Sequence, residues 1–141
     1  GGNVLRHFTK RVHKFCQSHQ DNPAMAEFVE PLAKLNGEWG ELTMAVGEKA
    51  MTNAEEVGAA SVDYLMYSGY VALAYMWARM AEVAQQRIDA GIDDPIYRAK
   101  IKTARFYFQR LLPRTASHKA AALAGADALM DISDEEFACQ N

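Results

Sequence analysis

Hydrophobic side chains recur at steps of three and four residues along nearly the whole chain. Two stretches near its start show this most regularly, at Val4, Leu5, Phe8, Val12, Phe15 and Cys16 and at Phe28, Leu32, Leu35, Trp39, Leu42 and Val46. This spacing places the apolar side chains on one face of an α-helix, and no short run alternates as a half-buried strand would. The pattern therefore predicts an all-α fold.

Residues that typically cap or stop helices separate the periodic stretches. Asn22-Pro23, Asn53, Gly91 and Asp94-Pro95 stand at the expected ends, because Asn and Asp favour N-caps and glycine favours the residue after a helix. Pro31 predicts either a kink in the second helix or a helix start close to that residue. The expected elements are a lead-in helix within 1–22, a second helix to about residue 50, a long helix of about 36 residues over 53–90, a fourth to residue 113, a fifth over about 114–130, and a tail over 131–141.

The predicted long helix is apolar on two faces. One face carries Val62, Leu65, Met66, Gly69, Leu73, Met76 and Met80, and the other carries Tyr64, Tyr67, Val71, Tyr75 and Ala78. A helix of this kind is expected to be covered from several sides. Short connections favour antiparallel neighbours, so we expect one helical domain over residues 1–141, an up-and-down bundle of four to five helices with one long central helix. In the fifth helix the side chains expected to point inward are Ala116, Ala120, Leu123 and Met130.

Composition narrows the class of protein. Fifteen Lys and Arg against eighteen Asp and Glu leave a net charge of −3, which gives no general reason to expect a nucleic-acid partner. The longest stretch without a formal charge, residues 64–78, is shorter than the roughly 20 residues of a membrane span, so we expect no transmembrane segment. Cys16 and Cys139 are the two cysteines and offer no disulfide framework, which favours a cytoplasmic location.

Candidate chemistry in the chain is sparse. None of the histidines follows a glutamate by three residues, the spacing of di-iron bundle sites. His13, Cys16 and His19 lack a fourth ligand, and Cys16 lies on the apolar stripe, so a zinc site is disfavoured. Glu38 and Glu41 are three residues apart but are expected to lie on a solvated face. We therefore expect no metal site and no catalytic residue in this chain.

Two charges border the most apolar part of the long helix. Asp63 and Arg79 are too far apart along it to pair with each other, and an unpaired buried charge costs several kcal/mol, at about the level of a broken buried ion pair. We expect Asp63 to be clamped by a cation of the next helix. The available cations there are Lys102, Arg105 and Arg110.

Three stretches carry a more specific signal. They are Asp63-Tyr64-Leu65 with Gly69 and Ala74-Tyr75-Met76-Trp77-Ala78; the stretch from Lys102 through Arg105-Phe106-Tyr107-Phe108 and Arg110 to Pro113; and the stretch from Ala124-Gly125-Ala126-Asp127 to Leu129-Met130. Together they resemble the C-terminal helical extension of the larger bacterial acyl-CoA dehydrogenases, over about residues 25–130.

The resemblance implies a parent flavoenzyme that binds FAD and oxidises an acyl-CoA between its α and β carbons. In that family the catalytic glutamate and the flavin-binding segments precede the extension, so we expect no catalytic residue, no cofactor and no activity in this chain alone. The resemblance also implies structural roles for Asp63 and, at a helix crossing, for Gly69 and Trp77. On the other side of the bundle it implies structural roles for Lys102, Arg105, Phe106, Tyr107, Arg110 and Pro113.

The expected partners are the catalytic body of the parent enzyme, a second subunit, or both, in a homo-oligomer. The alternative is an independent helical module that binds another protein through the aromatic faces of its long helix.

Overall fold

The fold was analysed in a computed structural model that describes residues 2–138, apart from the side chain of Leu129. Every regular element in this range is helical, which confirms the all-α prediction. The α-helices are α1 (Gly2–Ser18), α2 (Ala26–Thr52), α3 (Ala54–Asp89), α4 (Pro95–Phe106), α5 (Thr115–Leu123), α6 (Asp127–Met130) and α7 (Asp134–Phe137). A 3-10 turn over Pro23–Met25 precedes α2, and a π-helical turn over Tyr107–Leu111 followed by a 3-10 turn over Leu112–Arg114 joins α4 to α5.

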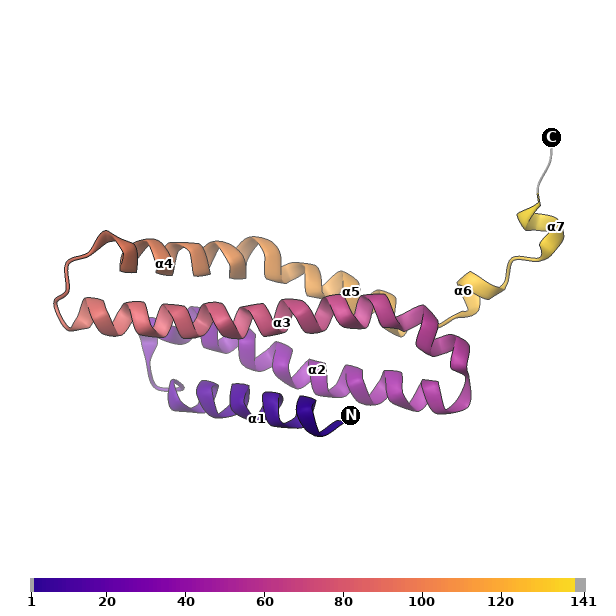
Figure 1. Ribbon diagram of the computed structural model, residues 1–141, viewed down its shortest axis with the longest axis horizontal. Helices are drawn as coiled ribbons and strands as arrows, with labels where there is room; N and C mark the ends of the chain where they lie inside the picture. Colours follow the sequence, from indigo (N-terminus) through magenta and orange to yellow (C-terminus); the bar gives the residue numbers. More distant parts are fainter. Residues whose placement is uncertain (1, 139–141) are drawn as a thin grey trace.

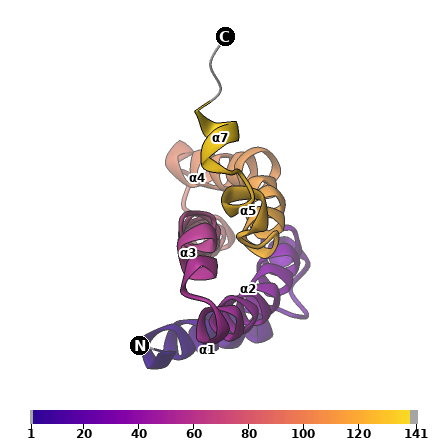
Figure 2. The same ribbon diagram turned by 90° about the vertical axis from the view of Figure 1, so that its right-hand side faces the viewer.

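The helices form an up-and-down bundle around α3 (Figures 1 and 2). The chain reverses direction after α1, after α2 and after α3, while α4 and α5 follow one another along the same side of α3. The four-to-five-helix bundle with one long central helix is therefore confirmed. The segment that carries α6 and α7 extends away from the end of the bundle (Figure 1).

Local capping signals explain where the helices begin and end. The side chains of Asn53 and Asp94 accept hydrogen bonds from the second residues of α3 and α4, at 3.0 Å in both cases. Gly91 has a φ of 80°, a left-handed conformation that glycine adopts without strain. Pro31 lies within α2, which begins at Ala26, so of the two alternatives considered for this proline the helix start is excluded.

Aromatic side chains form the centre of the core between α1, α2 and α3. Phe8 of α1 packs edge-to-face against Trp39 of α2 and Tyr75 of α3, with ring centroids 5.7 and 5.4 Å apart. Phe15 contacts the same tyrosine at 5.6 Å. These edge-to-face contacts fix the position of α1 on the face of α3 that carries Tyr67, Val71 and Tyr75.

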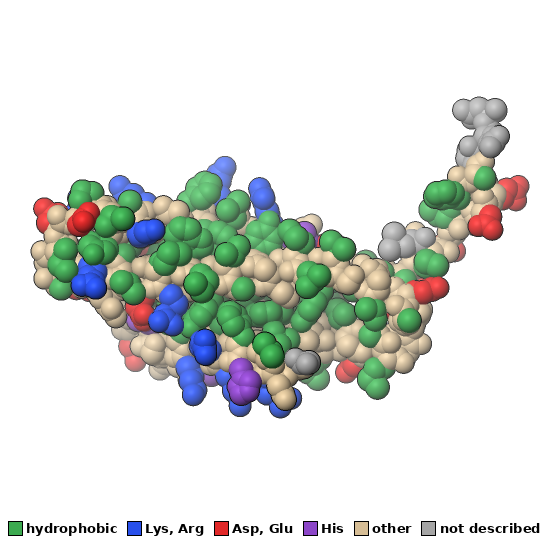
Figure 3. Space-filling model, in the orientation of Figure 1, with side chains coloured by type: hydrophobic (Ala, Val, Ile, Leu, Met, Phe, Trp, Pro, Cys, Tyr) green, Lys and Arg blue, Asp and Glu red, His purple; other side chains and the backbone are tan. Residues whose placement is uncertain are grey.

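The opposite face of α3 is open. Relative exposures are 68% for Val62, 68% for Leu65, 44% for Met66, 52% for Leu73 and 53% for Met76. The long helix is therefore covered on the sides that face α2 and the α4–α5 segment, as expected, whereas this face has no covering helix within residues 2–138. The surface view shows many hydrophobic side chains gathered along the middle of this side of the molecule, where α3 runs in Figure 1 (Figure 3).

Gly69 lies on the same open face. A methyl group built on it would meet no atom within 4 Å, so Gly69 does not mark a helix crossing within this chain. Trp77 is half-buried and packs against the core.

The fifth predicted helix is shorter than expected, and a different set of its side chains faces α3. Gly125, with a φ of 85°, separates α5 from α6, and the π-helical turn before α5 changes which of its side chains face α3. Ala116 and Ala120 are exposed, Leu123 is 38% exposed and Met130 is 58% exposed, so the predicted inward set is wrong. The buried residues of this part are Thr115, Ala122 and Ala126.

A helix both long enough and apolar enough to cross a membrane does not occur among residues 2–138. Cys16 is a free, buried cysteine. Cys139 lies outside the described residues, so the absence of a disulfide between the two stays a prediction.

Candidate functional site

The open side of α3 is the main candidate for a binding surface. We call Val62, Leu65, Met66, Leu73 and Met76, with Gly69 among them, the α3 face. Their spacing of three, four and seven residues places them on one stripe of the helix. The stripe continues into a hollow of about 310 Å³ between α3 and the start of α4, lined in part by Met80, Val83 and Tyr97. Monomeric proteins seldom expose a continuous apolar stripe of this kind, which indicates a surface that binds another protein segment.

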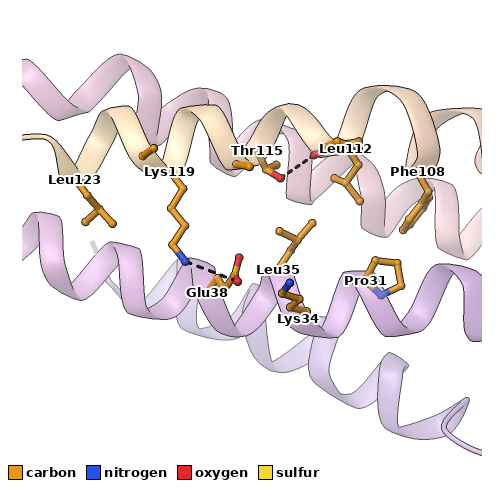
Figure 4. Close-up of a pocket in the computed structure, with 12 residues that line it drawn as sticks. Pro31, Lys34, Leu35, Glu38, Phe108, Leu112, Thr115, Lys119 and Leu123 are labelled. Atoms are coloured by element: carbon orange, nitrogen blue, oxygen red, sulfur yellow. Dashed lines mark hydrogen bonds and ion pairs between the residues drawn. The ribbon is translucent and has the colours of Figure 1, made fainter.

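A second hollow lies between α2 and the α4–α5 segment (Figure 4). It has a volume of about 540 Å³, and its floor includes Leu35, Phe108 and Leu112. At its rim, Nζ of Lys119 lies 3.7 Å from Oε1 of Glu38. Glu38 is therefore held in an ion pair across the two helices instead of lying on a fully solvated face as predicted. The hollow therefore offers a ligand mainly apolar contacts, because the carboxylate of Glu38 is already paired with Lys119.

Asp63 has a partner, but not one of the three predicted. Its Oδ1 lies 2.9 Å from Nδ1 of His118 on α5, and the His118 ring stacks on Tyr70 with centroids 5.8 Å apart. The reason is the antiparallel register of α3 and the following helices: the first half of α3 lies beside α5, whereas α4 lies beside its second half. Counting the same number of residues forward from Gly91 as Asp63 lies before it leads to position 119, next to His118 on α5.

The three predicted cations occupy other positions. Arg105 donates two hydrogen bonds of 2.6 and 2.9 Å to the carboxylate of Glu27 on α2, and this interaction raises the pKa of Arg105 further. Lys102 and Arg110 lie on the exposed side of α4 and the π-helical turn, beside Phe106.

Two further members of the resembling stretch lie close to this region. Tyr107 is buried and its hydroxyl donates a 2.6 Å hydrogen bond to the carbonyl of Tyr70, which ties the π-helical turn to α3. Pro113 is exposed and borders the hollow between α2 and α5. The structure thus brings Asp63 and Tyr107 near Tyr70 and His118, two residues that the sequence analysis did not single out, and separates them from Lys102, Phe106 and Arg110.

The second predicted charge, Arg79, pairs within its own helix. Its Nη1 donates a 3.0 Å hydrogen bond to the Tyr75 hydroxyl, and Nε lies 3.6 Å from Glu82. The hydrogen bond with Tyr75 raises the pKa of Arg79. Its side chain is 51% exposed, so no buried charge needs compensation here.

Of the three residues considered as zinc ligands, His13, Cys16 and His19, two have other interactions in the structure. Nε2 of His19 contacts Oε2 of Glu82, which joins the end of α1 to α3. Burial raises the pKa of the Cys16 thiol to about 11, so the thiolate that a metal needs is disfavoured. Among residues 2–138 there is no group of three or more His, Cys, Asp or Glu side chains placed to hold a metal ion.

Comparison with known proteins gives the family. The family described as "Acetyl-CoA dehydrogenase C-terminal like" matches residues 8–133. The chain belongs to this family, as the resemblance predicted. A curated relative from Mycobacterium tuberculosis, the broad-specificity linear acyl-CoA dehydrogenase FadE5, is 24% identical over 145 residues, a match that covers 96% of this chain and 24% of the relative. The chain therefore spans about a quarter of the length of that acyl-CoA dehydrogenase.

The residues of this chain do not by themselves fit FAD. A flavin dinucleotide needs polar groups aimed at its ring and its diphosphate, usually around a concave site. The two buried side-chain atoms without a hydrogen-bond partner among the described residues, Oδ1 of Asn36 and Nε1 of Trp39, line neither of the hollows described above. We derive no chemical step through a flavin bound to this domain.

Proposed function

We propose that this chain is the C-terminal helical domain of a flavin-dependent acyl-CoA dehydrogenase and that it serves assembly, not chemistry. In this proposal the α3 face packs against the catalytic body of the parent enzyme, a second subunit, or both. The parent would act in the cytoplasm on an acyl-CoA, with FAD and the catalytic glutamate supplied by the remaining three quarters of the enzyme. The exposed α3 face is the observation that carries the proposal.

The size of the α3 face indicates how it can be used. Covering five half-exposed apolar side chains contributes about 1 kcal/mol each, or roughly 5 kcal/mol in all, since full burial of such a side chain is worth about 1.5–3 kcal/mol. Bringing two free molecules together costs about 4–15 kcal/mol. The α3 face alone therefore suits a body joined through the same chain, whereas a second subunit needs further contacts.

The carboxylates of this chain support an assembly role. Glu38 is paired with Lys119 and Asp63 with His118, while Glu41 lies on the exposed surface of α2. A base that removes a proton from a substrate has to present a free carboxylate to it within hydrogen-bond reach. None of these three lies inside a hollow with such an arrangement.

The test is a pair of substitutions on the α3 face. In the full-length parent enzyme, we expect Leu65→Asp with Leu73→Asp to loosen the contact between this domain and the flavin-binding part, because two carboxylates would be buried in it. Limited proteolysis should then release the domain several-fold faster. The matched control is Thr103→Asp, which adds a charge on an exposed position of α4. Circular dichroism should show unchanged helix content for both variants, because all the substituted side chains are exposed.

Two results would count against the proposal. One is an unchanged rate of proteolytic release of the domain from the Leu65→Asp/Leu73→Asp parent enzyme. The other is turnover of an acyl-CoA by this chain alone with added FAD. Binding of an unrelated protein through the α3 face, with no affinity for a flavoprotein partner, would instead support the independent interaction module.

A further inference from the structure

Charge is sharply divided along the last third of the chain. Residues 95–126 contain seven Lys and Arg and no Asp or Glu, whereas residues 127–141 contain five Asp and Glu and no Lys or Arg. The two blocks follow one another directly. Such a division creates two surfaces that attract each other, provided that both are exposed.

The basic block forms an exposed patch with an aromatic centre. Lys102, Phe106, Gln109 and Arg110 line, with Arg105, an open hollow of about 350 Å³. Phe106 is 56% exposed. Arg105 is already bound to Glu27, but Lys102 and Arg110 form no ion pair within residues 2–138. We call Lys102, Phe106, Gln109 and Arg110 the α4 patch; cationic side chains stand out along this edge of the molecule in Figure 3.

The acidic block carries the complementary features. We call Asp127–Phe137 the acidic segment; its Phe137 is 85% exposed and Ile132 is 54% exposed. A capping box between Ser133 and Glu136 fixes the turn that presents Phe137. The backbone hydrogen bond from Ser133 lowers the pKa of Glu136, which keeps this carboxylate ionised. Figures 1 and 2 show the segment standing away from the bundle of its own chain.

We propose that the acidic segment of one copy of this chain binds the α4 patch of a second copy. Phe137 packs against Phe106, and the carboxylates of Asp134 and Glu135 lie between the cations of Lys102 and Arg110. An aromatic pair surrounded by opposite charges supplies both an anchor and an orientation. This contact is separate from the α3 face and does not depend on it.

The path of the chain favours a second copy over the same copy. α5 runs away from the α4 patch, and the acidic segment continues past the end of the bundle after Gly125 (Figure 1). Reaching the patch of its own chain would require the segment to reverse its direction. A neighbouring copy can approach the segment without any such change.

A second basic surface serves as an internal comparison. α1 carries Arg6, Lys10, Arg11 and Lys14 and no acidic residue. Apart from Val4 at the start of α1, its large apolar side chains are turned inward, so a bound segment finds no aromatic anchor beside these cations. If charge alone were responsible, the acidic segment would bind both basic surfaces. The proposed contact also needs the aromatic ring of Phe106, so it predicts binding to the α4 patch.

The test uses full-length chains with natural and 15N isotopes, mixed in equal amounts and treated with a carbodiimide, which joins carboxylates to amines that touch. Mass spectrometry then identifies the joined residues and shows whether they come from different chains. We expect mixed-isotope links from Asp134 or Glu135 to Lys102, several-fold more abundant than links to Lys10 or Lys14. Raising the salt concentration to about 0.5 M should reduce them, because exposed charges are screened.

Phe106→Ala and Phe137→Ala distinguish the proposed contact from general charge attraction. Each should lower the yield of the Lys102 links about two- to tenfold, the range expected for an aromatic pair, and leave the Lys10 links unchanged. Both side chains are exposed, so circular dichroism should show an unaltered fold. The links should persist in Leu65→Asp/Leu73→Asp, which separates this contact from that of the α3 face.

Three outcomes would overturn the proposal: links that join only residues of the same chain, equally abundant links to Lys10 and Lys102, or yields that do not respond to either Phe→Ala substitution.

Discussion

Oδ1 of Asp63 on α3 lies 2.9 Å from Nδ1 of His118 on α5, and this pair joins the two helices beside the ring of Tyr70 that stacks on His118. The side chains are 31% and 24% exposed, so water screens the interaction in part. The pair therefore contributes modestly to stability, within the range of partly exposed ion pairs.

The contribution of this pair can be measured with a double-mutant cycle. Asp63→Ala and His118→Ala should each lower the free energy of unfolding by about 0.5–1 kcal/mol, and the double variant by less than their sum. Urea unfolding followed by circular dichroism gives the three values. Asp131→Ala, at an exposed position, is the control and should change little. Strict additivity would show that the two side chains do not interact.

Gly69 provides a test of the open α3 face in the isolated chain. Gly69→Ala should raise the free energy of unfolding by about 0.5–1 kcal/mol, because glycine is unfavourable inside a helix and the added methyl group meets no neighbour. Thermal unfolding of a dilute sample measures the change. A loss of stability that grows with protein concentration would show a second chain packed closely against Gly69.

Two buried tyrosines predict sensitivity to alkaline pH. The Tyr67 hydroxyl donates a 3.0 Å hydrogen bond to the carbonyl of Leu35. Burial raises the pKa of both Tyr67 and Tyr107 above that of a free tyrosine. The folded state thus favours the protonated hydroxyls, and this stability is complete below the unfolded value of about 10 and is lost as pH rises above it. The free energy of unfolding should fall above about pH 10.

Tyr67→Phe separates the contribution of the Tyr67 hydrogen bond at neutral pH from the loss of stability at alkaline pH. At pH 7 it should cost about 0.5–1.5 kcal/mol, the usual value of one hydrogen bond, and the decline above pH 10 should become shallower. Urea unfolding at several pH values measures both. Tyr97→Phe is the control, because its hydroxyl makes no hydrogen bond within residues 2–138. An unchanged alkaline decline would exclude Tyr67 as its source.

Cys16 should react slowly with thiol reagents. Burial raises its pKa to about 11, and the reactive species is the thiolate. In a Cys139→Ser variant, modification by a chromogenic disulfide at pH 8 should be at least about a hundredfold slower in the native protein than in denaturant, since both thiolate population and access are reduced. Equal rates would show that the region between α1 and α2 opens readily.

The features of this fold that could be predicted from the sequence are those that depend on residues close together in the chain. The caps at Asn53 and Asp94 and the stop at Gly91 depend on neighbouring residues alone, and their positions were predicted correctly. The buried face of α3 was not identified, because both of its faces are apolar and only the placement of the other helices decides between them.

The partner of Asp63 shows a second limit. The cations of the next helix in sequence are the simplest expectation, but partners across antiparallel helices depend on the distance from the connecting turn, which leads to the part of α5 that carries His118. The prediction of which α5 side chains point inward is wrong for a related reason. Tyr107–Leu111 forms a π-helical turn, and the residue pattern of the sequence does not predict such a turn.

That turn also determines the rotational phase of everything that follows it. A π-helical turn bonds residue i to i+5 and so holds one residue more than an α-helical turn, whereas each residue of a regular α-helix advances the chain by about 100°. A further residue inserted within Tyr107–Leu111 would therefore rotate α5 by about that angle relative to α4. His118 would turn away from Asp63, and Ala122 would leave α3. The bundle can therefore accept many side-chain replacements at the exposed Gln109, but it cannot accept an added residue between Phe106 and Leu112, because two successive helices must both face the same long one.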